Sequence, residues 1–132
     1  MVDNRARGVA CYHPGYTLVE KLQTISTKYR KQQAQGSVPI NLMRHYYDVY
    51  CLLQEPVVLS FIGTPDYHAH KKKRFRSGDE PTIARNEAFL LSDPVTRSEY
   101  EKAYRITRAL YYKVQPDFAD ILNRIKTRID QL

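Results

Sequence analysis

Charged side chains interrupt two segments whose apolar spacing predicts α-helices. In the first segment Glu20 and Lys21 are charged neighbours on the predicted helix. In the second, Arg44 and His45 are four and three residues before Asp48, so one sector of a helix carries all three side chains. Lysine, arginine, imidazole and carboxylate groups could bind charged ligands or move protons, which an ordinary core helix does not need. The apolar stripe of the first helix consists of Leu18, Leu22, Ile25 and Tyr29.

Each of these charged residues also has a structural explanation. Thr17 followed three residues later by Glu20 fits a capping box, which predicts a helix that starts at Thr17. Arg44 and Asp48 fit an exposed helix ion pair, which contributes about 0.3 to 0.5 kcal/mol. Lys21 fits a solvated surface lysine. From spacing alone, these explanations come before a functional one.

A basic segment follows further along the chain. Five of the six residues from 71 to 76 are basic, and the whole chain has a net charge of +7 and a pI near 9.5. Basic residues next to aromatic ones suit the phosphates of a nucleic acid. Basic residues near a helix C-terminus also suit the helix dipole and keep a protein soluble. The sequence alone leaves both explanations open for Lys71, Lys72, Lys73, Arg74 and Arg76.

The order of these segments resembles the C-terminal portion of the AbiEii/AbiGii family of nucleotidyltransferase toxins. The resemblance starts near Pro14 and runs to the end of the chain. It implies a cytoplasmic bacterial toxin, usually one half of a toxin–antitoxin pair, that transfers a nucleotide from an NTP to an RNA acceptor such as tRNA. Its landmarks, in the same order as in that family, are residues 17–22, 44–50, 67–75, 89–91, Tyr100, Tyr104 and 115–122.

The resemblance also implies roles for the charged residues. Lys21 and Asp48 would be the catalytic residues: Lys21 offsets the triphosphate charge, and Asp48 orients or deprotonates the attacking hydroxyl. Lys21 would bind the nucleotide together with Glu20, Arg44 and His45, and Arg44 would hold either Asp48 or a phosphate. The basic segment 71–76 would bind the nucleic acid. These roles require Lys21 and Asp48 to lie close together on one face of the folded chain.

One element of that family has no counterpart in this sequence. Its members carry a glycine-rich turn followed by a strand with two carboxylates that hold Mg²⁺. Here Gly36 and Ser37 lead to Pro39, and Asp79 and Glu80 lie in a polar loop. We therefore expect a C-terminal lobe that lacks the N-terminal α/β catalytic domain and transfers nothing by itself. We expect no metal site and no cofactor in this chain, although Mg²⁺ and an NTP are implied for the complete enzyme.

The sequence predicts an all-α fold, a compact bundle of about five helices. A chain of 132 residues with 42% hydrophobic residues can bury the core of one domain, with a lead-in at 1–13 and a helical domain at 14–132. We assign the β-branched run 57–62 to a buried helix and 77–81 to a flexible surface loop. The expected helix boundaries are at Gly36, Pro39, Pro56, Thr64, Asp93 and Pro116. The apolar stripe of the last helix is Phe118, Ile121, Leu122, Ile125, Ile129 and Leu132.

Composition excludes several other classes of protein. No apolar run is long enough to span a membrane, and residues 1–7 lack the apolar core of a signal peptide. Cys11 and Cys51 cannot define a disulfide scaffold, and no Cys or His pair has the spacing of a strong zinc site. We therefore expect a cytoplasmic protein without a membrane partner.

The alternative is a non-catalytic basic helical module that binds RNA or a protein partner through residues 71–76. In that case Lys21 and Asp48 are ordinary structural residues. Other possible partners are an antitoxin, the missing N-terminal nucleotidyltransferase domain, or a second copy of the chain. A homodimer would form if the surface that once met the missing domain pairs with itself.

Overall fold

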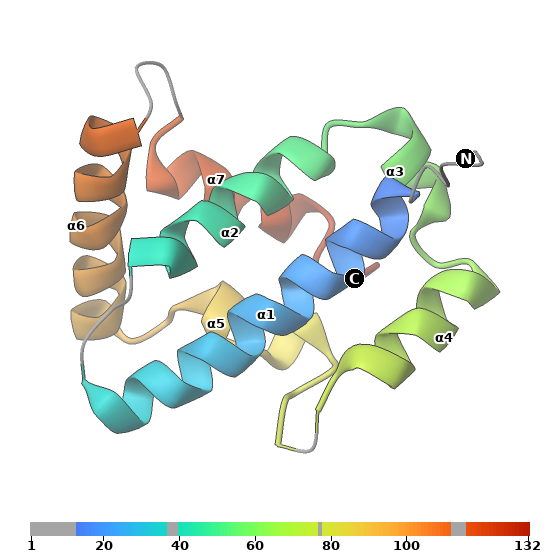
Figure 1. The fold of residues 1–132 in the computed structure, drawn as a ribbon, viewed down its shortest axis with the longest axis horizontal. Helices are drawn as coiled ribbons and strands as arrows, with labels where there is room; N and C mark the ends of the chain where they lie inside the picture. Colours follow the sequence, from blue (N-terminus) through green and yellow to red (C-terminus); the bar gives the residue numbers. More distant parts are fainter. Residues whose placement is uncertain (1–12, 37–39, 77, 112–115) are drawn as a thin grey trace.

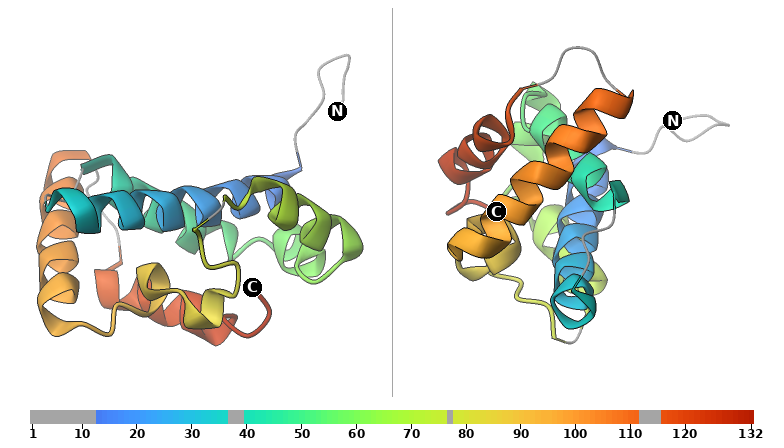
Figure 2. Two further views of the ribbon diagram at one scale, coloured as in Figure 1. Left: turned by 90° about the horizontal axis from the view of Figure 1, so that it is seen from below. Right: turned by 90° about the vertical axis from the view of Figure 1, so that its left-hand side faces the viewer.

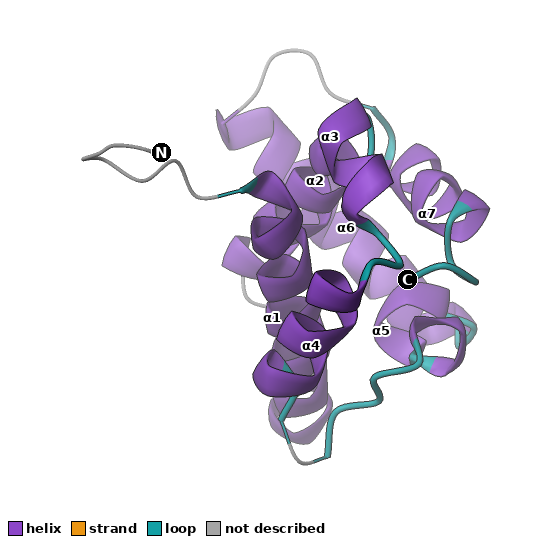
Figure 3. Cartoon of the chain, turned by 90° about the vertical axis from the view of Figure 1, so that its right-hand side faces the viewer, coloured by secondary structure: helices purple, strands orange, loops and turns teal. Residues whose placement is uncertain are grey.

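Seven α-helices and one 3₁₀-helix make up the part of the chain that the computed structural model describes, residues 13–36, 40–76, 78–111 and 116–132. No strand occurs in these ranges (Figure 3), so the predicted all-α class is confirmed. Among the described helices, none is both long and apolar enough to cross a membrane. The elements are α1 (Pro14–Gln35), α2 (Ile40–Leu52), α3 (Pro56–Phe61), α4 (Pro65–Arg74), η1 (Ile83–Arg85), α5 (Glu87–Leu90), α6 (Pro94–Tyr111) and α7 (Phe118–Thr127).

Some of the sequence predictions concern residues outside the described ranges. The predicted lead-in at 1–13 is described only at His13, and Cys11, Ser37 and Pro39 are also outside. The domain boundary after residue 13 therefore stays a prediction.

The helices form two layers that α6 joins at one end (Figures 1 and 2). α1 and α2 lie side by side in the first layer, and α3 and α4 continue it next to α1. α5 and α7 form the second layer, and α6 packs against α2 and α7. α1 contacts α2, α3, α4 and α5, so a single long helix positions elements on several sides.

α1 begins one turn earlier than the capping box predicts. Its first residue is Pro14, and the Nδ1 atom of the N-cap residue His13 accepts the backbone N–H of Gly15 at 2.9 Å. Proline suits the first helical position because its φ is already helical and its missing N–H would have no partner there. The prediction of Thr17 as the start is therefore wrong, and Glu20 lies too far along the helix for the predicted cap.

The other helix boundaries agree better with the sequence. Gly36 ends α1 in the left-handed conformation, with a φ of 92°, which glycine adopts without a steric cost. The Thr64 hydroxyl accepts the backbone N–H of Tyr67 at the start of α4. Asp93 accepts the backbone N–H of Thr96 at 2.9 Å at the start of α6. These caps are local in sequence, which is why they could be predicted.

α3 is helical, as predicted for residues 57–62, but it is only partly buried. Val58 has no exposed surface, whereas Val57 is 45% exposed. The run is apolar on both sides of the helix, so its composition did not distinguish the buried side from the exposed one.

The core is centred on Tyr46 of α2, whose side chain is fully buried. Its ring makes edge-on contacts with Phe89 of α5, Tyr100 of α6 and Phe118 of α7, at centroid distances of 6.4, 6.1 and 5.3 Å. Its hydroxyl donates to the backbone oxygen of Ala88. The predicted apolar stripes of the first and last helices are buried except for Tyr29 and Ile129, which are partly buried. The buried members, together with three apolar residues of α2, are Leu18, Leu22, Ile25, Phe118, Ile121, Leu122, Ile125 and Leu132, and Leu42, Val49 and Leu53.

The segment between α4 and α5 is tied to α1 through Asp79, which is only 8% exposed. The Asp79 carboxylate accepts hydrogen bonds from the Thr27 hydroxyl at 2.8 Å and from Nε of Arg30 at 2.9 Å. It also accepts the backbone N–H of Arg76 at 3.1 Å. A buried carboxylate is tolerated when it is paired and hydrogen-bonded in this way. The predicted flexible surface loop is therefore anchored at its centre.

We expect Asp79→Ala to lower the free energy of unfolding by about 2 kcal/mol, because it leaves the Thr27 hydroxyl and the Arg30 guanidinium without their partner. Glu80→Ala, at the exposed neighbouring carboxylate, should cost less than about 1 kcal/mol. Urea denaturation of the two variants and the native chain measures both values. Equal losses in the two variants would contradict the anchoring role of Asp79.

Candidate functional site

Lys21 and Asp48 meet where α1 packs against α2. The Nζ atom of Lys21 lies 3.0 Å from Oδ2 of Asp48 and 3.3 Å from Nδ1 of His45. Lys21 precedes the buried Leu22, and Asp48 precedes the buried Val49, so both charged side chains leave their helices at the rim of the interface. The Lys21 side chain is 28% exposed and that of Asp48 is 37% exposed, so the pair is open to a ligand.

Three cations act on the half-buried imidazole of His45. Burial lowers the pKa of His45 from its usual value of 6.5, and the positive charges of Lys21, Lys28 and Arg44 lower it further, whereas Asp48 raises it. The imidazole is therefore kept neutral near pH 7. We call the five residues Lys21, Lys28, Arg44, His45 and Asp48 the α1–α2 site.

Arg44 does not form the ion pair that its spacing from Asp48 predicts. Its side chain is exposed, and among the described residues no ion pair or hydrogen bond joins it to Asp48. Lys21, which comes from the neighbouring helix, binds the carboxylate instead. An exposed pair within one helix contributes little, so a partly buried contact between helices can replace it.

Glu20 faces a different helix from Lys21. Its Oε2 atom lies 3.2 Å from Nε2 of His70 on α4. The ring of Tyr16 packs edge-on against His70, with a centroid distance of 4.8 Å. Adjacent positions on a helix point about 100° apart, which turns Glu20 toward α4 and Lys21 toward α2. The structure therefore brings Lys21, Arg44 and His45 together but separates Glu20 from them.

The five basic residues of segment 71–76 do not all face solvent. Lys72, Lys73 and Arg76 are exposed. Lys71 is half-buried and donates from Nζ to the backbone oxygen of Leu132. Arg74 is also half-buried and donates from Nη2 to the side-chain oxygen of Gln23 on α1, at 3.3 Å. Only part of the segment is therefore the basic surface that the sequence predicts.

Basic residues of α1, together with Arg74 and Arg76, line a hollow of about 430 Å³. Among the described residues, eight line it, of which five are basic and none is acidic. Arg30 is neutralised by Asp79, while Nε of Arg74 is buried without a hydrogen-bond partner. Lys28 lines this hollow, and its charge also acts on His45 of the α1–α2 site. We call the hollow the basic groove; its lining is Gln23, Thr24, Thr27, Lys28, Arg30, Lys31, Arg74 and Arg76.

Sequence reasoning missed the basic residues that α1 contributes to this groove. Lys21, Lys28 and Lys31 recur at spacings of seven and three, which places them on one side of a helix. That spacing could have predicted Lys28 and Lys31. Arg30 had no such signal, because its position depends on Asp79, which is 49 residues away.

We expect the pKa of His45 to move in opposite directions when its two nearest charges are removed. Lys21→Met should raise it, because a neighbouring cation disfavours the imidazolium. Asp48→Asn should lower it further, because the carboxylate that favours the imidazolium is removed. NMR titration of the imidazole measures both shifts, and Lys102→Met, at an exposed position of α6, is the matched control. Two shifts of the same sign would be inconsistent with the geometry.

The chain matches a protein-family model over most of its length. The family is described as Nucleotidyl transferase AbiEii toxin, Type IV TA system, and the match covers residues 2–124 of 132. No curated protein and no solved structure matches the chain. The family match confirms the resemblance first seen in the order of the sequence landmarks. The chain belongs to the AbiEii nucleotidyltransferase toxin family.

Proposed function

We propose that the chain binds the substrates of a nucleotidyltransferase toxin, with the triphosphate of an NTP at the α1–α2 site and the phosphates of an RNA acceptor in the basic groove. The main support is that the charges of Lys21, Lys28 and Arg44 all act on His45. His45 lies next to the ion pair of Lys21 and Asp48, whose side chains are partly exposed. Positive charge in excess at such a place favours a multiply charged anion. A nucleoside triphosphate is that anion in the reaction of the family.

Lys21 and Asp48 have complementary roles in this proposal. Lys21 donates a hydrogen bond to a phosphate oxygen and stabilises the negative charge that develops during transfer. Asp48 accepts a hydrogen bond from the acceptor hydroxyl and orients its oxygen toward the phosphorus atom that it attacks. The 3.0 Å contact between the two side chains holds both near the position of the reaction before any substrate arrives.

The remaining residues of the predicted nucleotide site assist in different ways. Arg44 is exposed, and its guanidinium can reach a phosphate with two parallel hydrogen bonds. His45 is kept neutral, so it offers one hydrogen-bond donor and one acceptor without adding charge. Glu20 acts indirectly, because its contact with His70 holds α4 against α1 and so fixes one side of the basic groove.

The described residues do not fit a Mg²⁺ site. No group of three His, Cys, Asp or Glu side chains among them could hold a metal ion. Asp48 is paired with Lys21, and Asp79 is paired with Arg30. None of the steps proposed here therefore passes through a metal ion bound by these residues.

The basic groove is suited to the sugar–phosphate backbone of RNA. Lys31 and Arg76 are exposed at its surface, and Lys28, which also lines it, acts on the α1–α2 site through its charge. Each phosphate that a basic side chain neutralises releases counterions and makes binding more dependent on salt. An RNA held in the groove would have to extend past Lys28 toward the α1–α2 site for its acceptor hydroxyl to reach Asp48.

We expect Lys21→Ala to weaken NTP binding about tenfold or more, because it removes a charge-assisted hydrogen bond to phosphate. Asp48→Ala should not weaken binding, because it removes a negative charge that repels the triphosphate. Isothermal titration calorimetry with each of the four NTPs, with and without Mg²⁺, measures these affinities. Lys102→Ala on α6 is the control and should bind like the native chain. If Lys21→Ala also binds like the native chain, the α1–α2 site does not hold the triphosphate.

We expect the double variant Lys28→Glu with Lys31→Glu to lose most of its affinity for tRNA. Its plot of log affinity against log salt should be shallower than that of the native chain, by about 0.7 to 0.9 in slope for each phosphate that no longer has a basic partner. Lys102→Glu with Lys126→Glu makes the same change in net charge elsewhere and serves as the control. Fluorescence anisotropy with labelled tRNA over a range of salt concentrations measures both quantities. If the affinity for tRNA falls only when the charges of Lys72 and Lys73 are reversed, the RNA binds on the outer side of α4 instead.

The same variants test the alternative function, a non-catalytic basic module that binds RNA or a protein. That alternative is correct if RNA binding depends on the basic residues while Lys21→Ala and Asp48→Ala change neither NTP binding nor transfer in an active toxin. Labelled NTP incubated with Mg²⁺ and total tRNA provides the transfer assay.

The family description refers to a toxin–antitoxin system, so an antitoxin is the partner expected from the family. A contact between the antitoxin and this chain stays a prediction, as does the cytoplasmic location. The homodimer is also a prediction, and light scattering tests it.

A further inference from the structure

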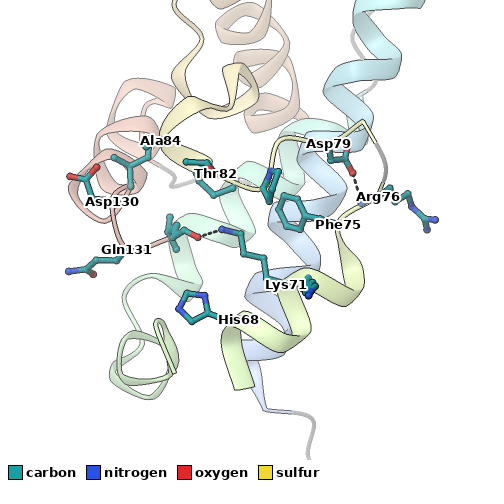
Figure 4. A pocket seen from close by; sticks show the side chains of 14 residues that line it. His68, Lys71, Phe75, Arg76, Asp79, Thr82, Ala84, Asp130 and Gln131 are labelled. Atoms are coloured by element: carbon teal, nitrogen blue, oxygen red, sulfur yellow. Dashed lines mark hydrogen bonds between the residues drawn. The ribbon is translucent and has the colours of Figure 1, made fainter. Parts of the chain in front are cut away.

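A second hollow lies between α4, the segment at 79–84 and the last residues, 129–132 (Figure 4). Its volume is about 640 Å³. Pockets for small ligands commonly have volumes of about 300 to 1,000 Å³ and apolar walls with a few polar groups. Arg76 lines both this hollow and the basic groove, and no residue of the α1–α2 site lines it. The hollow is therefore separate from the proposed NTP site.

The walls of this hollow are largely apolar. Phe75 follows α4, Ile83 and Ala84 come from η1, and Ile129 and Leu132 come from the end of the chain. Ile83 and Leu132 are also part of the buried core, at 1% and 5% exposure, so they are held in place from behind. Phe75, Ala84 and Ile129 are only partly buried, and their apolar surface gains free energy when a ligand removes it from water.

Lys71 supplies the central polar group. In Figure 4 its side chain extends from α4 across the hollow toward Leu132, whose backbone oxygen accepts a hydrogen bond from Nζ. The ammonium lies 5.9 Å from the ring centre of Tyr67 and 5.7 Å from that of Phe75. Burial lowers the pKa of Lys71, and the charge of Glu80 opposes that shift. An ammonium has three N–H donors, so Lys71 has donors left for a ligand.

The other charged residues of the lining leave the hollow with a positive bias. Lys72 adds a second cation from α4. Asp79 lines the hollow, but Thr27 and Arg30 of α1 bind its carboxylate oxygens. Asp130 lies on the side opposite α4 in Figure 4, away from Lys71. Arg76 is a third cation of the lining, whereas the negative charge of Glu80 acts on Lys71 from nearby. An anionic group beside Lys71 would therefore meet a small excess of positive charge.

We propose that this hollow binds a small amphipathic anion, a ligand with an aromatic or aliphatic body and one negatively charged group. The body lies against Phe75, Ala84 and Ile129, and the charged group accepts hydrogen bonds from Lys71. A neutral ligand would remove water from the Lys71 ammonium without supplying an opposite charge, which costs free energy. A bare inorganic anion would leave the apolar walls in contact with water. The Lys71 ammonium and the apolar walls together therefore favour a ligand that has both a negative charge and an apolar body.

The test uses two fluorescent probes of similar shape that differ in charge. 1-Anilinonaphthalene-8-sulfonate has an aromatic body and one sulfonate, and N-phenyl-1-naphthylamine has the same body without the charge. We expect one sulfonate probe to bind per chain, and Lys71→Met to weaken its binding about tenfold or more by removing the charged donor while keeping the aliphatic stem. Binding of the neutral probe should change less than about twofold in Lys71→Met, because the apolar walls are unchanged.

Two further variants distinguish this site from general adsorption. Lys73→Met, an exposed neighbour on α4 that does not line the hollow, should bind the sulfonate probe like the native chain. Ala84→Phe should block both probes by filling the hollow, with circular dichroism and thermal unfolding used to verify that each variant is folded. The proposal is wrong if Lys71→Met and Lys73→Met bind the sulfonate probe equally well, or if folded Ala84→Phe still binds it. Absence of binding to the native chain, or binding of several probes per chain, would also overturn it.

Discussion

The burial of Tyr46 fixes the rotation of α2, and the placement of the charged residues on α2 follows from it. The Tyr46 ring packs against three helices of the core, and its hydroxyl is bound to the backbone oxygen of Ala88. With Tyr46 turned into the core, Asp48 points about 200° away around the helix axis. That direction leads to the rim of the α1–α2 interface, where Lys21 binds it. A charged pair between helices thus depends on a neutral aromatic side chain in the core.

α1 also determines where the charged residues lie, because it packs against other helices on several sides. Three consecutive residues illustrate it: Glu20 contacts His70 of α4, Lys21 contacts Asp48 of α2, and Leu22 is buried in the core. Further along the same helix, Lys28 and Lys31 line the basic groove. A helix of 22 residues is about 33 Å long, which is enough to carry both the proposed triphosphate site and the proposed acceptor groove.

Buried polar groups hold the segments that are not long helices. Asp79 binds the connection after α4 to α1, and the Tyr67 hydroxyl donates to the backbone oxygen of Leu132 at 2.8 Å. Likewise, the Tyr104 hydroxyl donates to the backbone oxygen of Pro116 at 2.7 Å, next to α7. Buried hydroxyl and carboxylate groups are costly unless they are paired, so these contacts specify one position for each segment. The walls of the hollow beside Lys71 depend on the contacts of Asp79 and of the Tyr67 hydroxyl.

The local features of the chain are those that could be predicted from its sequence. Gly36, Thr64 and Asp93 mark helix ends because capping involves only neighbours in the chain. The apolar stripes were also predictable, since burial follows the periodicity of the helix. The start of α1 could not be predicted in this way, because Thr17 and Pro14 both suit the first turn of a helix and only the fold selects between them. The family was recognisable as well, from the order of several landmarks rather than from any single motif.

Contacts between charged residues were decided by the tertiary structure. By itself, the sequence determined that Lys21, Arg44 and Asp48 lie on helices beside apolar stripes, and it predicted a pair between Arg44 and Asp48. The fold pairs Asp48 with Lys21 instead and buries Asp79 against α1. The physical reason is that spacing along a helix fixes only which side a residue takes. The partner that it meets depends on how two helices are rotated and packed against each other, which is set by core contacts distant in the sequence.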